Sequence, residues 1–253
     1  MDIKKNIKYQ SLLKLVLPLA LIVFWQIASK FKWLNSSIMP SPLRILQAFI
    51  FNIKSGLIFE HLAASLRRVA IGFLSGVLAG IFVGFFVGFY KLLDNLLNGL
   101  LNFMRSIPTV GLIPLFILWF GIGEESKIIV IAISTFWSVL VNTQQGLMST
   151  DKKLIEVAQI LEKDQRTIFF KIILPSSLPA IISGIRLGLS AAWKAVVAAE
   201  MIASIRGIGY MISYARELSQ PDVLFVGLII IGLIGLFLDF VLIKIQKKLI
   251  KWA

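Results

Sequence analysis

Residues 151–175 read DKKLIEVAQILEKDQRTIFFKIILP, a mostly polar run in a chain that is otherwise largely apolar. Hydrophobic sequence precedes this run and follows it. A chain that only has to turn between two membrane spans needs no more than a short loop. A polar, amphipathic segment of this length therefore predicts a docking surface for a soluble partner.

The first half of this segment has the pattern of a short helix. Leu154, Ala158 and Leu161 lie at positions i, i+4 and i+7, which places them on one helical face. Asp151 is a suitable N-cap for this helix, and Thr150 could serve instead. The pattern predicts a short helix that presents one apolar face.

The composition of the chain is typical of a membrane protein. Its 253 residues are 58% hydrophobic and 15% charged, and the mean hydropathy is +0.88. Soluble domains are about half apolar and carry about a quarter charged residues. Because a bilayer-crossing helix needs roughly 20 apolar residues, we expect an all-α polytopic membrane protein with six transmembrane helices. The predicted spans are about 12–31, 65–90, 96–120, 128–147, 176–200 and 222–244.

The predicted spans divide the chain into four parts. The first part resembles a signal peptide in having lysines before an apolar stretch, but that stretch is too long and lacks a clean cleavage site, so we expect it to be retained. The four parts are an N-terminal transmembrane helix over 1–31, an interfacial or extracytoplasmic connection over 32–64, a core over 65–245 that includes the segment 151–175, and a basic cytoplasmic tail over 246–253.

The net charge of +13 comes from Lys and Arg residues that mostly flank the hydrophobic spans. This placement indicates membrane topology and contacts with lipid headgroups rather than nucleic-acid binding. More of these residues lie on the side that holds the two termini and the segment 151–175. We therefore expect a multi-pass protein of the inner (cytoplasmic) membrane with both termini and this segment in the cytoplasm.

Two of the predicted spans have unusual backbones. In the third span, Pro108 and Pro114 predict a kinked or broken helix. In the second span, a glycine recurs at every fourth residue and forms a smooth stripe that lets another helix approach closely, either within the chain or from a second subunit. The glycines of this stripe are Gly72, Gly76, Gly80, Gly84 and Gly88.

The chain lacks the residues that catalysis would need. It contains no GxxxxGK[ST] phosphate-binding loop, so it should not hydrolyse ATP by itself. It has no cysteine, and its one histidine, His61, has no second histidine with which to build a metal site. We therefore predict a chain that is not an enzyme and that holds no cofactor or metal of its own.

The long polar segment also carries a recognisable signature. Glu156-Val157-Ala158, followed by Ile172-Ile173-Leu174-Pro175, resembles the cytoplasmic loop of ATP-binding-cassette importer permeases. In that family an ATPase subunit grips the membrane subunit through this loop. The residues expected to couple to the ATPase are Leu154, Glu156, Ala158, Leu161, Glu162, Ile172, Leu174 and Pro175.

Two positions of the signature depart from the family, and the first is Val157, which replaces the second-position alanine. Glu162 stands where the family usually has glycine, which permits a left-handed turn after the short helix. A glutamate in that conformation would cost about 1 kcal/mol. We therefore expect the helix to continue and the chain to turn near Lys163 and Asp164.

Further segments are similar to the nitrate/sulfonate/taurine/bicarbonate-type branch of these permeases, whose relatives also import thiamine-precursor pyrimidines and riboflavin. The resemblance implies a type I importer permease fold. It also implies a homodimer with two ATPase subunits, which hold ATP and Mg, and an extracytoplasmic substrate-binding protein. The segments are 61–73, 105–108, 114–124, Asn142-Thr143, Ala192-Trp193 and Ala199-Glu200.

Charged residues inside the predicted spans are candidates for a translocation pathway, because a charge in the bilayer needs a partner or a water-filled cavity. Arg105, Arg186 and Lys194 outnumber the acid Glu200, which favours an anion such as a sulfonate, taurine, nitrate or bicarbonate. The alternative is structural: Arg186 reaches the inner surface, and Lys194 pairs with Glu200 or with another span. The predicted pathway residues are Arg105, Pro108, Trp193, Lys194 and Glu200.

Other functions remain open at this point. Within the importer class, the solute could be a thiamine-precursor pyrimidine or riboflavin. A secondary transporter or channel that works alone is the leading rival class, but such proteins often repeat broken helices in both halves, and Pro108 and Pro114 have no counterpart in the later spans. A purely structural membrane subunit is a third alternative.

Overall fold

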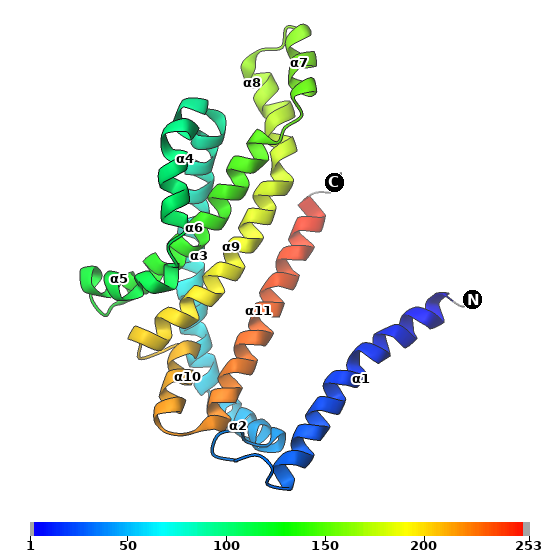
Figure 1. Ribbon diagram of the computed structural model, residues 1–253, viewed down its shortest axis with the longest axis vertical. Helices are drawn as coiled ribbons and strands as arrows, with labels where there is room; N and C mark the ends of the chain where they lie inside the picture. Colours follow the sequence, from blue (N-terminus) through cyan, green and yellow to red (C-terminus); the bar gives the residue numbers. More distant parts are fainter. Residues whose placement is uncertain (1–2, 250–253) are drawn as a thin grey trace. The chain divides into compact units, whose positions relative to one another are not determined.

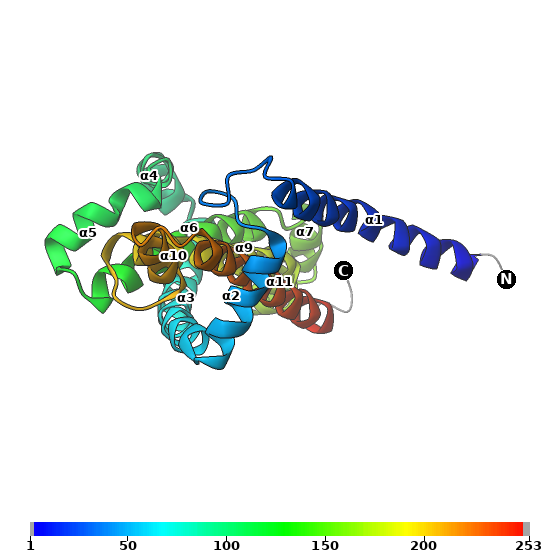
Figure 2. The same cartoon turned by 90° about the horizontal axis from the view of Figure 1, so that it is seen from below.

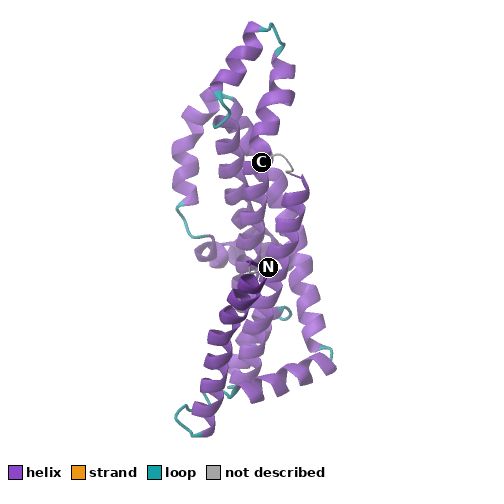
Figure 3. Ribbon diagram, turned by 90° about the vertical axis from the view of Figure 1, so that its right-hand side faces the viewer, coloured by secondary structure: helices purple, strands orange, loops and turns teal. Residues whose placement is uncertain are grey.

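The computed structural model describes the backbone of residues 3–249 and the side chains of residues 16–248, and every regular element in the described backbone is a helix (Figure 3). The elements are α1 (Ile3–Lys30), α2 (Pro42–Lys54), α3 (Leu57–Phe89), α4 (Lys91–Arg105), η1 (Thr109–Leu112), α5 (Ile113–Phe120), α6 (Glu124–Met148), α7 (Lys152–Ile160), α8 (Gln165–Ile168), η2 (Phe169–Ile173), α9 (Leu174–Ala203), α10 (Ile208–Glu217) and α11 (Pro221–Leu249).

The chain forms two compact units. The first comprises the chain up to Glu60 together with Met211–Ile230, and the second comprises His61–Tyr210 together with the chain from Ile231 onward. All the residues predicted to form the coupling segment and the pathway belong to the second unit. The second unit therefore contains the candidate functional site.

In the first unit, α1 and α2 are joined by an irregular segment (Figures 1 and 2). Pro42 starts α2, where a proline costs no helical hydrogen bond, and the Ser41 hydroxyl accepts a bond of 3.3 Å from the Arg44 N–H. Arg44 forms an ion pair of 3.2 Å with Asp222 at the start of α11. The segment 32–64, predicted as a connection, thus contains a helix of its own.

The spans of the chain begin and end at different residues from those predicted. α3 begins at Leu57 rather than near residue 65. α6, α9 and α11 contain the whole of the predicted fourth, fifth and sixth spans. α11 continues to Leu249, so the predicted tail over 246–253 begins inside a helix, and its last four residues lie outside the described part of the chain.

The predicted third span is broken into two helices. α4 and the helical segment Thr109–Phe120, which contains η1 and α5, meet at 80° (Figure 1). Pro108 precedes η1, where its ring fixes the backbone and removes an N–H, so α4 cannot continue through it. The predicted break is therefore a sharp change of direction.

Four described helices are long and apolar enough to cross a membrane, and the bent pair makes a fifth if it counts as one span. These helices are α3, α6, the continuous helix Gln165–Ala203 and α11. Within the part of α1 whose side chains are described, Val16–Lys30 is an apolar helix shorter than a full span. The chain is thus an all-helical, multi-pass protein, and the sixth span stays a prediction.

Glycines bring three long helices of the second unit close together. A Cβ atom at Gly72 would lie 2.7 Å from the Cβ of Ile131, and one at Gly84 would lie 2.8 Å from the carbonyl oxygen of Leu140. The glycine stripe of α3 therefore packs directly against α6 of the same chain. On its other side, α6 meets α9, where Gly184 approaches the side chain of Asn142.

The hydrophobic core of the second unit lies where α3, α5, α6 and α9 meet. Its members come from all four helices, so the bent segment after α4 is anchored by the same core that holds the long spans. The buried residues of this core are Val69, Ile113, Phe116, Val130, Ile131, Ala192, Trp193, Ala195, Val196 and Ala199.

The glycine contacts predict opposite effects for two glycine-to-alanine changes. Gly84→Ala places a methyl group against the α6 backbone, so we expect it to destabilise the protein. Gly99, on α4, has no atom within 4 Å of such a methyl group, and Gly99→Ala should stabilise its helix by up to about 1 kcal/mol. Thermal unfolding of the purified variants measures both effects. A gain in stability for Gly84→Ala would contradict the packing.

Candidate functional site

The segment 151–175 forms a helical hairpin at one end of the second unit, between α6 and α9 (Figure 1). Asp151 is the N-cap of α7, as predicted, and its Oδ1 accepts a hydrogen bond of 2.9 Å from the Lys153 N–H. Ala158 is buried, whereas Leu154 and Leu161 are more than half exposed. The short helix therefore rests on the protein through Ala158 and leaves two apolar side chains exposed.

The turn after α7 differs from the expectation. The helix ends at Ile160, and Glu162 has a φ angle of +54°, in the left-handed region. The Glu162 N–H bonds the Gln159 carbonyl at 2.9 Å, and the Lys163 N–H bonds the Ala158 carbonyl at 3.0 Å. The expectation that the helix continues toward Lys163 and Asp164 was wrong, because these bonds satisfy the carbonyls at the helix end and offset the cost of the conformation.

The returning arm of the hairpin enters α9 without a loop. Asp164 caps α8 by accepting from the Thr167 N–H at 3.3 Å, and hydrogen bonding from Thr167 holds the pKa of Asp164 below its usual value. η2 is a π-helix in which the Leu174 N–H bonds the Phe169 carbonyl. Pro175 has no N–H, so it cannot donate the usual helical hydrogen bond to the carbonyl four residues earlier. The wider π-helical turn of η2, just before Pro175, accommodates this missing bond.

The carboxylate of Glu200, in the last part of α9, is the centre of a buried polar network. Residue Glu200 is 1% exposed. It accepts hydrogen bonds from the Ser65 hydroxyl at 2.9 Å, from Arg68 Nη1 at 2.7 Å and from the Gly209 N–H at 3.0 Å. A Cβ atom at Gly207 would collide with this carboxylate. Glycine at 207 therefore lets the loop close over Glu200.

Arg68 joins Glu200 to a second acid. Its Nε and Nη2 donate to the Glu124 carboxylate at 2.7 and 2.8 Å, and Nη1 also donates to the Arg206 carbonyl at 2.7 Å. Lys127 lies 3.2 Å from Glu124 and donates to the Ala203 carbonyl at 3.2 Å. Two cations thus balance two acids, and the network ties the starts of α3 and α6 to the end of α9.

This network corrects the predicted charge pairing. Glu200 pairs with Arg68 and not with Lys194. Sequence reasoning treated Arg68 as a topology signal and missed its role. The available signal was a pair of arginines at the start of an apolar span together with one acid inside another span, but the sequence does not say which cation approaches that acid.

Arg186 also has a specific acidic partner. Its Nε and Nη2 donate to the two carboxylate oxygens of Asp239 on α11 at 2.6 and 3.0 Å. Beside this pair, a cavity of about 230 Å³ lies between α9 and α11 and is lined in part by Trp193 and Lys194. Trp193 is buried and donates its indole N–H to the Ile231 carbonyl at 3.0 Å. Lys194 therefore belongs to the α9–α11 cavity.

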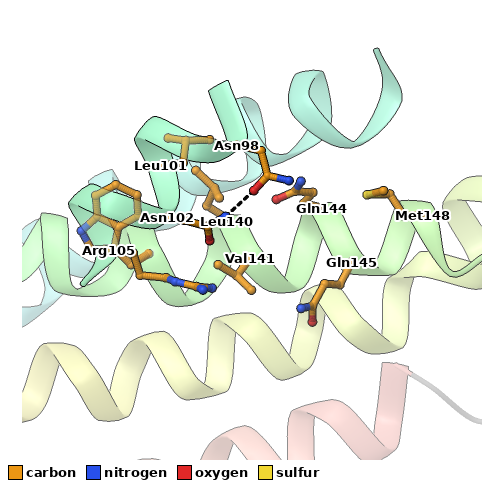
Figure 4. A pocket seen from close by; sticks show the side chains of 10 residues that line it. Asn98, Leu101, Asn102, Arg105, Leu140, Val141, Gln144, Gln145 and Met148 are labelled. Atoms are coloured by element: carbon orange, nitrogen blue, oxygen red, sulfur yellow. Dashed lines mark hydrogen bonds between the residues drawn. The ribbon is translucent and has the colours of Figure 1, made fainter. Parts of the chain in front are cut away.

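Arg105 lines a different cavity, between α4 and α6, with a volume of about 180 Å³ (Figure 4). The structure therefore does not bring Arg105 and Lys194 into one cavity within the chain. Pro108 lies outside both cavities, as the exposed N-cap of η1. The cavity at Arg105 is lined by Asn98, Leu101, Asn102, Arg105, Trp137, Leu140, Val141, Gln144, Gln145 and Met148.

The cavity at Arg105 contains polar residues that sequence reasoning did not single out. Asn98 and Asn102 come from α4, and Gln144 and Gln145 come from α6. Among the described residues, no group of three or more His, Asp or Glu side chains could hold a metal ion. The polar side chains of the two cavities are thus suited to hydrogen bonding and ion pairing.

Several long apolar helices, a polar hairpin at one end and cavities that contain charged side chains are features expected of the membrane subunit of a transport system. The chain belongs to the family of binding-protein-dependent transport system inner membrane components, whose pattern matches residues 76–251. It is therefore a transport permease and a multi-pass membrane protein.

Two relatives illustrate the branch of this family. The chain is 40% identical over 238 residues to a putative aliphatic sulfonates transport permease protein of Bacillus subtilis (strain 168), covering 94% of this chain and 86% of the relative. It is 32% identical over 241 residues to the taurine transport system permease protein of Escherichia coli (strain K12), covering 93% and 87%. The chain thus lies in the sulfonate and taurine branch.

A solved structure gives the same fold. The inward-facing MetNI methionine ABC transporter contains a chain that aligns with a TM-score of 0.67 at 17% identity, covering 77% of this chain and 97% of that chain. At this level of sequence identity the similarity shows only that the two chains share a fold. The chain thus shares its fold with a chain of an ABC transporter, in agreement with the resemblance found in the sequence.

Proposed function

We propose that this chain forms the translocation pathway of an ATP-driven importer for a small organic sulfonate. The observation that carries the substrate class is the 40% identity, over 94% of the chain, to a permease named for aliphatic sulfonates. A second relative with this name, from Escherichia coli (strain K12), is 38% identical over 93% of the chain. Arg105 and Lys194 line cavities and make no ion pair within the described residues, which agrees with an anionic solute.

The proposed assembly contains more than this chain. A second copy completes the pathway, two ATPase subunits bind ATP and Mg, and an extracytoplasmic binding protein delivers the solute. The exposed residues Leu154 and Leu161 on the hairpin support a contact with the ATPase, since exposed apolar side chains beside charged ones suit a protein interface. The residues proposed to make this contact are those predicted from the sequence: Leu154, Glu156, Ala158, Leu161, Glu162, Ile172, Leu174 and Pro175.

The substrate class is tested by uptake into vesicles that contain the complete importer with its binding protein. We expect ATP-dependent uptake of ethanesulfonate. Excess unlabelled riboflavin should not compete. A relative named for riboflavin transport, from Chloroflexus aurantiacus, is 34% identical over 92% of the chain, so riboflavin is the informative competitor. Uptake of riboflavin in preference to the sulfonate would overturn the proposed substrate.

The proposed topology has six spans with both termini and the segment 151–175 in the cytoplasm. The chain has no cysteine, so single cysteines report their side of the membrane without background from this chain. Lys153→Cys and Gln220→Cys both replace exposed side chains. We expect an impermeant thiol reagent added to intact cells to label Gln220→Cys and to label Lys153→Cys only after lysis. Labelling of both in intact cells would contradict the topology.

A further inference from the structure

The helix α4 carries a polar face that the proposed function does not by itself explain. Asp94, Asn98, Asn102 and Arg105 recur at steps of four, four and three residues, so they lie on one side of the helix. Leucines and other large apolar residues make up most of the rest of α4, where Leu92, Leu96 and Phe103 are largely exposed. A polar face in a helix this rich in leucine needs a polar partner or a wet cavity.

The first three of these residues form a hydrogen-bonded chain, which we call the amide ladder (Asp94, Asn98 and Asn102). Asn98 Nδ2 donates to Asp94 Oδ1 at 3.1 Å, and Asn102 Nδ2 donates to Asn98 Oδ1 (Figure 4 shows the second bond). Gln144 of α6 also donates to Asp94 Oδ1, at 2.8 Å. Asp94 Oδ1 thus accepts hydrogen bonds from two amide groups.

The ladder has a direction. Each amide side chain carries two N–H groups and donates one of them to the acceptor on its Asp94 side. Asn98, Asn102 and Gln144 therefore each keep one N–H beyond these bonds. Arg105 follows at the opposite end, about 16 Å along the helix from Asp94, and makes no ion pair within the described part of the chain.

The cavity beside the ladder is lined by two kinds of surface (Figure 4). One is polar and is formed by Asn98, Asn102, Arg105, Gln144 and Gln145. The other is apolar and is formed by Leu101, Trp137, Val141 and Met148, among others. Pockets for drug-sized molecules measure about 300–1,000 Å³, so a cavity of about 180 Å³ suits a smaller solute with a polar head and a short apolar tail.

We infer that the cavity between α4 and α6 is the site at which the sulfonate headgroup passes through this chain, an inference that rests on the proposed function. A sulfonate is a monoanion whose three oxygens only accept hydrogen bonds, and the site offers amide N–H donors with one guanidinium. The alkyl tail of the sulfonate meets the apolar surface. Asp94, bonded at the far end of the ladder, disfavours a second negative charge on the solute.

The donors also suit passage rather than tight binding. Conduction requires that a solute bind well enough to enter and weakly enough to leave. Neutral amides supply directed hydrogen bonds without the strong attraction of several cations, and Arg105 alone supplies the positive charge. The site therefore selects an anionic oxygen headgroup and still releases it.

The inference is tested by the reaction rate of a cysteine placed in the cavity of the assembled importer. Gln145→Cys lies in the cavity, and Asn95→Cys lies on the exposed side of α4 as a control. The probes are two methanethiosulfonates, one that carries an ethanesulfonate and one that carries a trimethylammonium group. We expect the anionic-to-cationic rate ratio to be about three- to tenfold higher at Gln145→Cys than at Asn95→Cys, because Arg105 attracts the anion.

Two further measurements make the result specific. Arg105→Gln should return the rate ratio at Gln145→Cys to that of the control, and free ethanesulfonate should slow the labelling. Val141→Cys provides a second position in the cavity if Gln145→Cys yields no intact complex on a sizing column. Equal ratios at cavity and control positions, or a ratio that does not respond to Arg105→Gln, overturn the site.

Uptake of ethanesulfonate by the same wild-type importer separates this inference from the proposed function. An anion preference in the cavity without sulfonate uptake supports a site for an anionic solute and overturns a sulfonate as that solute. Sulfonate uptake without any anion preference at Gln145→Cys or Val141→Cys supports the proposed function and overturns the site.

Discussion

Arg68→Met is expected to destabilise the protein by about 3–5 kcal/mol, because it leaves the buried Glu200 carboxylate without its cation. The yield of intact protein on a sizing column and its unfolding temperature should both fall sharply. Methionine keeps much of the apolar bulk of the arginine stem, so the loss reports the charge and its hydrogen bonds.

Two companion variants isolate the cause. Arg67→Met removes an exposed cation at the adjacent position and should have an effect within about 0.5 kcal/mol. The double variant Arg68→Met with Glu200→Gln removes the stranded charge and keeps acceptors for Ser65 and Gly209, so it should recover part of the loss. A double variant no more stable than Arg68→Met would contradict the account of this network.

Glu156→Lys is expected to reduce ATP-driven uptake by about tenfold or more, since a charge-assisted hydrogen bond contributes about 1.5–3 kcal/mol. Glu156 is exposed on α7, beside the apolar residues proposed to contact the ATPase. The chain should still insert and fold, because Glu156 makes no ion pair within the described structure. Uptake and substrate-stimulated ATPase activity should fall together.

Glu217→Lys is the matched control for this change. It reverses the charge of another exposed glutamate, on α10, which the proposed topology places on the opposite side of the membrane. Its coupling between ATP hydrolysis and uptake should stay intact. Normal uptake by Glu156→Lys in an intact complex would show that the hairpin does not transmit the motion of the ATPase.

The features that could be predicted from the sequence depend on local chemistry. Asp151 caps α7 because an aspartate side chain satisfies a nearby backbone N–H wherever a helix begins after it. The break in the third span follows from Pro108, which cannot continue a helix in any surroundings. Such features need no knowledge of the rest of the fold.

The features that were missed depend on contacts between distant parts of the chain. Arg68 and Glu200 are 132 residues apart, and only the packing of α3 against α6 and α9 brings them together. The conformation of Glu162 was mispredicted because its cost was weighed without the two hydrogen bonds that close the turn. The amide ladder was within reach of sequence reasoning, since its spacing alone indicates one polar face.

The central claim is that this chain transports a solute only as part of an ATP-driven importer. The most direct test is uptake of ethanesulfonate into proteoliposomes that contain this chain with or without the ATPase subunit. The binding protein is supplied on the extracytoplasmic side of the chain, and ATP is supplied on the side of the ATPase. The account predicts uptake only when chain, ATPase, binding protein and ATP are all present. Uptake by this chain alone, driven by a solute or ion gradient, would contradict it.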